Sequence, residues 1–414
     1  MAEQSQYRKL LDVVKLLNAS LDFDHIKAVI MEQAKAVFKA EASSLIFLDK
    51  EKNELYFDVA TGDKGERIKE IRFPADKGIA GWIIQNKKPL LVKDVSSDPR
   101  FFQGVDKKSE FVTKSIIGVP VWINGEAIGL IEVLNKEDGG SFTEKELSLL
   151  QTFADLAALN LKNAMWHKDA LDKERMEADL RIAGEIQERL LPRNDIRIKG
   201  YDYVAQYRAC RSVGGDYYDV LPYGEHHVLF VVADVSGKGA PAALVMSTLR
   251  AYLHSAVRFH MKLQDIVSLL NNSIFNDTEA QRFVTLILGI LNTKNHDMEF
   301  INAGHNYPVL LSSEGLPLFL ESNDIPLGIM DGYEFSTHHL KLKSGGSLVL
   351  YTDGITEAMD DDENLYGEKE FEKDLKKGRS MTPEALSRLL FEQALNFAND
   401  KPGDDMTLLV FRRE

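Results

Sequence analysis

The chain has 414 residues, 44% of them hydrophobic and 28% charged, which is enough for two or three packed domains. Its 64 acidic and 50 basic residues give a formal net charge of −14, which argues against an overall nucleic-acid-binding surface. A single cysteine excludes an intramolecular disulfide, and no apolar run approaches the roughly 20 residues that span a bilayer. We therefore expect a cytoplasmic protein with no membrane insertion and no nucleic-acid partner.

Residues 1–20 are predicted to form a helix with an apolar stripe, and residues 21–160 alternate helix and strand patterns. A helix is predicted over 24–39, followed by the strands SSLIFLD and LYFDVA around a KEKN turn. The strands VPVWI and IGLIEVL flank Asn124-Gly125, a strong hairpin signal. Thr143 and Glu146 have the spacing of a capping box before the next helix.

The order of motifs in residues 21–160 resembles a GAF domain, a small ligand-sensing module. The motifs are Gly78-x-x-Gly81-Trp82, PLLVKDV, SIIGVPV and Gly129-Leu130-Ile131. The resemblance implies a small-molecule ligand of unknown identity. Asn135-Lys136, Phe142 and Glu146 also follow a pattern of cyclic-nucleotide-binding GAF domains, but Leu147 stands where that pattern has an acid. A surface turn followed by a capped helix is the interpretation we favour for these residues over nucleotide binding.

A long helix is predicted from about Glu144 to Leu191, stopped by Pro192. Its second part, 161–192, is predicted to be a coiled-coil linker. Apolar residues recur along the helix at spacings of three and four, and this stripe shifts phase after Leu171. Its members are Leu147, Leu150, Ala154, Ala157, Leu161, Ala164 and Leu171, then Met176, Leu180, Ala183 and Leu190, with the polar Gln187 in register. Either the first half packs only on the preceding domain and the rest is a solvated connector, or the helix forms a homodimer. We favour the homodimer because Tyr7, Leu10, Leu11, Val14 and Leu17 offer a second stripe.

Residues 200–414 contain several apolar strands, and four aspartates lie near strand ends. FVTLILGIL, MEFINAGH, SLVLYTD and MTLLVFR are predicted strands, with helices at 242–257, 263–275 and 383–399. The aspartates are Asp216 in VGGDYYD, Asp234 in DVSGKG, Asp353 in YTDG and Asp404 in GDDMT. Carboxylates gathered from distant strands repel one another, and hard divalent cations resolve that conflict. The pattern predicts a binuclear metal site.

Five ordered motifs, VGGDYYD, ADVSGKGAPAAL, NAGHNYP, YTDGITEA and DDMTLLV, resemble the metal-dependent protein phosphatase (PPM) family. They are most similar to its bacterial branch, named for the stage II sporulation protein E. The resemblance implies an α+β chain whose C-terminal domain is an α-β-β-α sandwich over 200–414. It also implies two Mn²⁺ or Mg²⁺ ions and a phosphoserine or phosphothreonine protein as substrate, here an anti-sigma-factor antagonist of bacterial partner switching.

The resemblance also implies roles for individual residues. Asp234 would bridge the two ions with the main-chain carbonyl of Val235 on one of them, and Asp353 and Asp404 would complete the other site. Asp216 would hold an ion directly or through water, and Arg211 matches an arginine that contacts phosphate in some family members. His305 would be either structural or close to the site.

Several alternatives stay open. Asp353 before Gly354 has the spacing of an ordinary turn residue, and the sequence does not decide between Asp404 and Asp405 as metal ligand, although the family pattern points to Asp404. A non-enzymatic scaffold that signals by binding is the rival function. A nucleotide cyclase also uses paired aspartates, but its purine and phosphate contacts have no counterpart in the sequence.

Overall fold

The computed structural model describes residues 20, 22–62, 71–192, 196–278, 282–312 and 315–414. The chain divides into two compact units, Met1–Arg175 and Met176–Glu414. The N-terminal stripe from Tyr7 to Leu17 lies outside the described residues. Across those described ranges, no helix is both long and apolar enough to cross a membrane.

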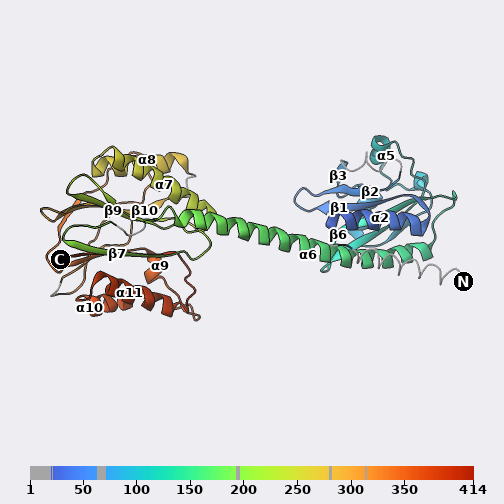
Figure 1. Ribbon diagram of the computed structural model, residues 1–414. Helices are drawn as coiled ribbons and strands as arrows, with labels where there is room; N and C mark the ends of the chain where they lie inside the picture. Colours follow the sequence, from blue (N-terminus) through green and yellow to red (C-terminus); the bar gives the residue numbers. More distant parts are fainter. Residues whose placement is uncertain (1–19, 21, 63–70, 193–195, 279–281, 313–314) are drawn as a thin grey trace. The chain divides into compact units, whose positions relative to one another are not determined.

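Unit 1 is built on a six-stranded antiparallel sheet in the order β3-β2-β1-β6-β5-β4 (Figure 1). Its strands are β1 (Ala40–Asp49), β2 (Glu54–Ala60), β3 (Arg72–Pro74), β4 (Leu90–Val92), β5 (Ile116–Ile123) and β6 (Glu126–Lys136). Its helices are α2 (Phe23–Phe38), α4 (Gly78–Asn86), α5 (Gly104–Ser109), the 3-10 turn η1 (Val95–Ser97) and the start of α6 (Glu144–Glu188). The predicted 24–39 helix and both predicted hairpins are confirmed, and Asn124 and Gly125 have the positive φ angles, 52° and 81°, that a two-residue type I′ turn requires.

The capping box before α6 is also confirmed. The backbone N–H of Thr143 donates to Glu146 Oε2 at 2.8 Å, and the N–H of Glu146 donates to Thr143 Oγ1 at 3.3 Å. These two bonds satisfy donors that a helix start leaves without an intrahelical partner.

Helix α6 is 45 residues long and ends at Glu188, three residues before the predicted end. Leu150, Ala154, Ala157, Leu161 and Ala164 are buried in the hydrophobic core of unit 1, together with residues of α2, β1, β5 and β6. The first half of the predicted stripe therefore packs inside unit 1, as the alternative interpretation expected. A charge at Leu161 would disrupt that core rather than report on a dimer.

Unit 2 contains two five-stranded antiparallel sheets, in the orders β14-β11-β10-β9-β8 and β13-β12-β15-β16-β7. The first sheet is formed by β8 (Tyr217–Pro222), β9 (His227–Val235), β10 (Val284–Asn292), β11 (Asp297–Ala303) and β14 (His338–Lys341). The second is formed by β7 (Tyr201–Arg208), β12 (Val309–Leu311), β13 (Leu318–Phe319), β15 (Ser347–Tyr351) and β16 (Met406–Arg413). The helices are α7 (Ala240–Arg258), α8 (Leu263–Asp277), α9 (Asp353–Thr356), α10 (Gly367–Gly378) and α11 (Pro383–Phe397).

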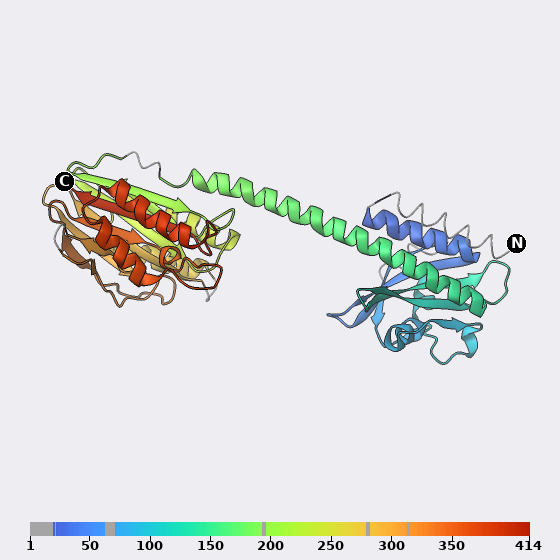
Figure 2. The same cartoon turned by 90° about the horizontal axis from the view of Figure 1, so that it is seen from below.

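The two sheets of unit 2 stack face to face with helices outside both. Helices α7 and α8 cover the first sheet, and the red helices α10 and α11 cover the second (Figures 1 and 2). Phe230, Phe300 and Phe411 fill the space between the sheets. Because both faces of the central strands are covered, β9, β10 and β16 are apolar at nearly every position. The predicted α-β-β-α sandwich is confirmed; α10 is a helix that the sequence patterns did not indicate.

Candidate metal centre

The four predicted aspartates gather at one edge of the sandwich. Asp216 precedes β8 and Asp234 is the second-last residue of β9, and these antiparallel neighbours pair Tyr217 with Ala233. Asp353 follows β15 and opens α9, and Asp404 lies two residues before β16. Since β15 and β16 are antiparallel, the end of one strand and the start of the other meet at the same edge. Each sheet supplies two of the four carboxylates.

Asp216 joins the two sheets. Its side chain is buried, and Oδ2 accepts hydrogen bonds from Thr352 Oγ1 at 2.8 Å and Thr407 Oγ1 at 2.5 Å, both from the opposite sheet. Burial, and then the neighbouring charge of Asp234, raises the pKa of Asp216 well above its ordinary value. Two hydroxyl groups orient this carboxylate but do not neutralise it.

Asp234 and Asp353 are in the same electrostatic situation. Burial, and then the charges of Asp353 and Asp404, raises the pKa of Asp234 to about 7. Burial, and then Glu357 and Asp404, raises the pKa of Asp353 to about 6. A cluster of crowded oxygen ligands with raised pKa values is a donor set for hard divalent cations such as Mg²⁺ or Mn²⁺, so the residues present fit the two predicted ions.

One of the four acids, Asp404, forms an ion pair with a lysine side chain. Lys238, in the DVSGKG turn, lies 2.7 Å from Asp404 Oδ2 and donates to the carbonyl of Gly403 at 2.6 Å. The lysine side chain is about one-third exposed. It ties the turn after β9 to the segment before β16.

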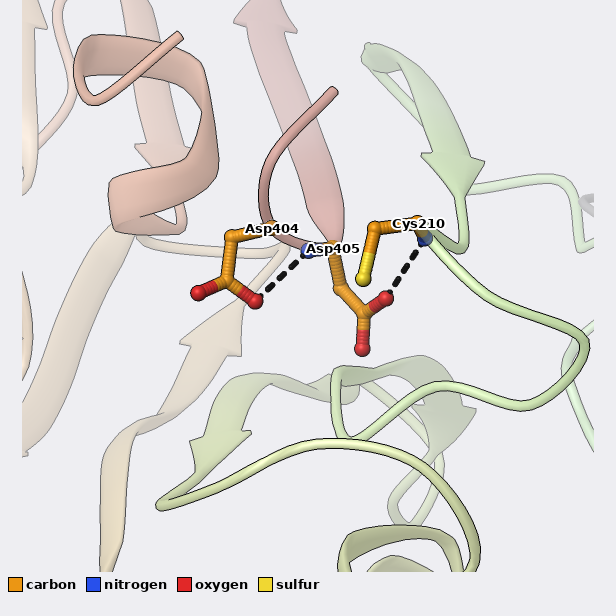
Figure 3. A group of neighbouring side chains, drawn as sticks. All are labelled: Cys210, Asp404 and Asp405. Atoms are coloured by element: carbon orange, nitrogen blue, oxygen red, sulfur yellow. Dashed lines mark hydrogen bonds between the residues drawn. The ribbon is translucent and has the colours of Figure 1, made fainter. Parts of the chain in front are cut away.

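Asp405 differs from Asp404 in its hydrogen-bond partners (Figure 3). Its Oδ1 accepts from the backbone N–H of Cys210 at 2.8 Å, and its Oδ2 accepts from the N–H of Gly215 at 2.5 Å. Asp404, by contrast, is half-buried, and its Oδ1 accepts from a single N–H among the described residues, that of Asp405 at 2.8 Å. Asp405 therefore fixes the loop before Asp216, a role that the sequence patterns did not reveal.

Cys210, Asp404 and Asp405 place ligand atoms within 4.8 Å of one another, as Figure 3 shows. The four predicted acids are spread more widely than this triple. Both oxygens of Asp405 accept backbone N–H groups, and burial together with Asp405 raises the pKa of Cys210 to about 12. A protonated thiol and a fully engaged carboxylate are poor ligands for hard cations. The triple is therefore better explained as a structural anchor than as a metal site.

Two glycine positions bring the segments of the site together. A Cβ on Gly354 would lie 2.0 Å from the carbonyl oxygen of Asp405, so only glycine allows α9 to pack against the start of β16. Gly239 has φ of 77°, and a Cβ there would lie 3.8 Å from a terminal nitrogen of Arg211. The exposed Arg211 thus lies beside the DVSGKG turn.

His305 is buried next to Thr285, a residue of the strand that pairs with the strand of Asp234. It is buried, its Nδ1 is 2.7 Å from Thr285 Oγ1, and Thr285 pairs with Asp234 across β9 and β10. Burial lowers the pKa of His305 to about 4, so the ring is neutral near pH 7. This environment favours the structural interpretation of His305.

In unit 1, the residues of the cyclic-nucleotide pattern make internal contacts. Asn135 Oδ1 accepts from the N–H groups of Lys114 and Ser115 at 2.7 and 3.2 Å, and Lys136 pairs with Glu146 at 2.9 Å. Phe142 is buried in the core. These contacts favour a structural role for the pattern, as expected.

A cavity of about 80 Å³ lies between the sheet of unit 1 and its smaller helices. Five phenylalanines line it, namely Phe57, Phe73, Phe101, Phe102 and Phe111. Glu132 and Ser44, opposite each other on β6 and β1, also line it. Ser44 Oγ is buried and has no hydrogen-bond partner among the described residues. Asp106 faces the same cavity, but Thr113 occupies its carboxylate.

Comparison with known families matches residues 22–161 to the GAF domain model and residues 224–414 to the stage II sporulation protein E (SpoIIE) model. The chain carries a GAF domain and a SpoIIE-type phosphatase domain. Asp234, Asp353 and Asp404 fall within the matched phosphatase stretch, whereas Arg211 and Asp216 precede it.

The chain is 25% identical over 244 residues to phosphoserine phosphatase RsbU of Bacillus subtilis, which covers 58% of this chain and 72% of RsbU. It is 28% identical over 273 residues to protein IcfG of Synechocystis, covering 59% of this chain but only 42% of IcfG. The SiaA-PP2C domain of Pseudomonas aeruginosa superposes with a TM-score of 0.53 at 19% identity, over 59% of this chain and all of that domain. The last comparison shows the fold of the phosphatase domain.

We expect the GAF domain to lose stability as the pH rises from 5 to 8. Burial raises the pKa of Glu132 to about 7, above that of a glutamate in the unfolded chain, so the folded state binds this proton more tightly. The stabilisation is fully present below the unfolded pKa and is lost as the pH rises through the folded value. About 2–3 kcal/mol of that loss should fall between pH 5 and pH 8.

Glu132→Gln should flatten this pH dependence, whereas the exposed Glu51→Gln should leave it intact. The three tryptophans, Trp82, Trp122 and Trp166, all lie in unit 1, so their fluorescence in denaturant titrations at pH 5 and 8 follows this domain alone. Parallel pH profiles for the wild type and Glu132→Gln would contradict the assignment.

Proposed function

We propose that this protein is a metal-dependent phosphoserine/phosphothreonine protein phosphatase controlled by its GAF domain. The observation that carries the proposal is the cluster of Asp216, Asp234, Asp353 and Asp404, which a SpoIIE-type domain brings to one edge of its sandwich from both sheets. A scaffold that only binds partners would have no need to keep four mutually repelling carboxylates together.

Asp234, Asp353, Asp404, Asp216 and the carbonyl of Val235 would hold two Mn²⁺ or Mg²⁺ ions. Ions bound there would neutralise the phosphate and lower the pKa of a water. Thr352 and Thr407 hold the Asp216 carboxylate in place, and Lys238 orients Asp404. Arg211, beside the DVSGKG turn, is the residue we assign to phosphate contact.

An open groove of about 740 Å³ runs beside Asp353. Glu321, Glu357, Glu368, Glu372, Lys369 and Tyr307 are among the residues that line it. Its openness suits a peptide segment better than a small metabolite, and its acidic lining favours basic side chains next to the phosphorylated residue. These features support a protein substrate.

The substrate that we propose is a phosphorylated anti-sigma-factor antagonist of a bacterial partner-switching pathway, in the cytoplasm. The similarity to phosphoserine phosphatase RsbU supports the phosphoserine chemistry, and the single cysteine is consistent with a reducing compartment. The test is phosphate release from a phosphoserine protein by the full chain, with Mn²⁺ and with chelator. No release at saturating Mn²⁺ would favour the scaffold.

The GAF cavity supports a ligand of a particular chemistry. Glu132 is buried, and among the described residues neither a cation beside it nor a hydrogen-bond partner for the Ser44 hydroxyl is found. Aromatic walls with a carboxyl and a hydroxyl at one end suit a small planar molecule that carries N–H donors or a positive charge. We propose such a molecule as the regulatory ligand.

We propose a homodimer formed through the exposed middle and end of α6. Leu171, Ile182 and Ile186 are 40%, 57% and 58% exposed, and at ~100° per residue they fall within about 60° of one another around the helix axis. An apolar helix face of this kind suits a second copy of the same helix. The predicted seam around Gln187 differs, since Gln187 is buried against the phosphatase domain itself.

Ile182→Glu is therefore expected to shift the protein from dimer toward monomer in light scattering at micromolar concentration. The side chain is exposed, so the new charge weakens only self-association. Ala170→Glu adds the same charge about 120° away around the helix and should leave the mass unchanged. A wild type that is already monomeric, or equal masses for the two variants, would refute the dimer.

A further inference from the structure

The end of α6 is locked onto the loop that leads to Asp216. Gln187 is buried, with 6% of its surface exposed. Its Nε2 donates to the carbonyl of Gly214 at 2.7 Å, and its Oε1 accepts from the N–H of Gly214 at 3.0 Å. A single side-chain amide thus satisfies both backbone groups of one loop residue.

Glycines make this contact close. A Cβ on Gly184 would lie 2.1 Å from the carbonyl oxygen of Ser212, so the helix surface touches the loop backbone directly. A Cβ on Gly214 would lie 2.2 Å from the hydroxyl of Tyr207 and 2.7 Å from Asp405 Oδ2. Helix and sheet therefore enclose the loop from two sides.

The opposite side of the loop (residues 210–215) is held by Asp405, at the sandwich edge where the four aspartates lie. Asp405 accepts from the N–H groups of Cys210 and Gly215, and Gly215 is followed directly by Asp216. Just beyond α6, Arg250 Nε of α7 donates to the carbonyl of Leu190 at 2.7 Å. The helix end is thus fixed to both the loop and α7.

We infer that Gln187 is a positioning residue: through its paired hydrogen bonds to Gly214 it transmits the position of the α6 end to the carboxylate of Asp216. Loss of both bonds would leave two buried backbone groups of Gly214 unpaired, which a loop relieves by moving toward water. Displacement of α6 therefore loosens one ligand of the metal site while the sheets stay intact. The inference rests on the metal site proposed above.

Gln187→Ala in the full chain is the test. We expect Mn²⁺ affinity in titration calorimetry to fall by ten-fold or more, and backbone amides of residues 210–216 in the metal-free protein to exchange at least ten-fold faster. Gln187→Glu can still accept from the N–H of Gly214 but repels its carbonyl, so it should fall between the wild type and Gln187→Ala. The exposed Glu185→Ala, on the same turn of α6, is the matched control and should match the wild type.

Gly184→Ala is a second variant, and it separates the stability of α6 from metal binding: α6 should become more stable while metal binding weakens. Alanine favours helix more than glycine does, yet its Cβ would displace Ser212, so α6 should exchange more slowly while Mn²⁺ binds more weakly. Unchanged exchange in β10 confirms that each variant is folded. Wild-type metal affinity and loop exchange in both Gln187→Ala and Gly184→Ala would overturn the inference. A wild type that binds no Mn²⁺ would instead refute the proposed function.

Discussion

Asp234→Asn is expected to abolish metal-dependent phosphatase activity while the protein stays folded. Asp234 lies where the two sheets meet, in contact with Asp216 and within electrostatic reach of Asp353 and Asp404. An amide at this position removes one negative charge from the donor set and leaves only one oxygen to coordinate. Loss of an outer-shell partner of a metal typically costs about 10–100-fold in affinity or activity, and loss of a residue proposed to hold the metal directly should cost at least the upper end of that range.

The thermal stability of this variant should equal or exceed that of the metal-free wild type. Burial and repulsion disfavour the ionised form of Asp234, as its raised pKa of about 7 indicates, and asparagine removes that cost. Phosphate release from a phosphoserine protein, Mn²⁺ stoichiometry by calorimetry and thermal unfolding should be measured together.

The exposed Asp331→Asn, which makes the same chemical change outside the cluster, serves as the control for that variant. Chelator should remove the activity of the wild type and Mn²⁺ should restore it. Full turnover by Asp234→Asn, or by the wild type in metal-free buffer, would reject the proposed mechanism.

Replacing Asp404 and Asp405 separately by alanine should give different outcomes, although both changes should abolish activity. Asp405 accepts two backbone N–H groups, from Cys210 and Gly215, in a buried position. Hydrogen bonds to charged groups contribute about 1.5–3 kcal/mol each, so Asp405→Ala, which removes two of them, should lower the free energy of unfolding of the phosphatase domain by about 3–6 kcal/mol. The metal-free protein should show this loss in full.

Asp404→Ala should leave that free energy within about 1 kcal/mol of the wild-type value, because it removes a partly exposed ion pair with Lys238. It also removes a charge that disfavours the ionised forms of Asp234 and Asp353. Its effect should appear instead as weak Mn²⁺ binding. Denaturant titrations of the metal-free proteins, followed by circular dichroism, separate the two variants. The reverse result, an unstable Asp404→Ala and a stable Asp405→Ala that binds no Mn²⁺, would assign the metal to Asp405.

The sequence alone was sufficient to find many of the helices and strands and the four acids, but not α10. Strand and helix periods depend on neighbours in the chain, so the hairpin at Asn124-Gly125 and the capping box at Thr143 could be predicted from local patterns. The aspartates of the phosphatase domain stand out because each lies at the end of an apolar run next to a glycine turn or another acid. Their ordered motifs placed them in one family, which supplied the two-sheet sandwich.

Contacts between segments far apart in the sequence could not be predicted from local patterns. Nothing in the sequence next to Asp405 shows that its oxygens accept the N–H groups of Cys210 and Gly215. Thr352 and Thr407 have the sequence context of ordinary strand residues, and only the packing of the two sheets brings them to Asp216. The α6 stripe is the same case. Its period correctly predicted a helix, but Leu161 packs in the unit 1 core and Gln187 on the Gly214 loop rather than in a shared seam.

The sequence by itself thus determined the order of the predicted elements, the domain families and the residue types of the proposed metal centre. The tertiary structure decided which acid orients a loop, which faces of α6 are already buried, and how the helix end contacts the site. The physical reason is that apolar periodicity fixes which side of an element is buried but not against what. The partner depends on how layers far apart in the sequence stack, and on where glycine lets two backbones approach.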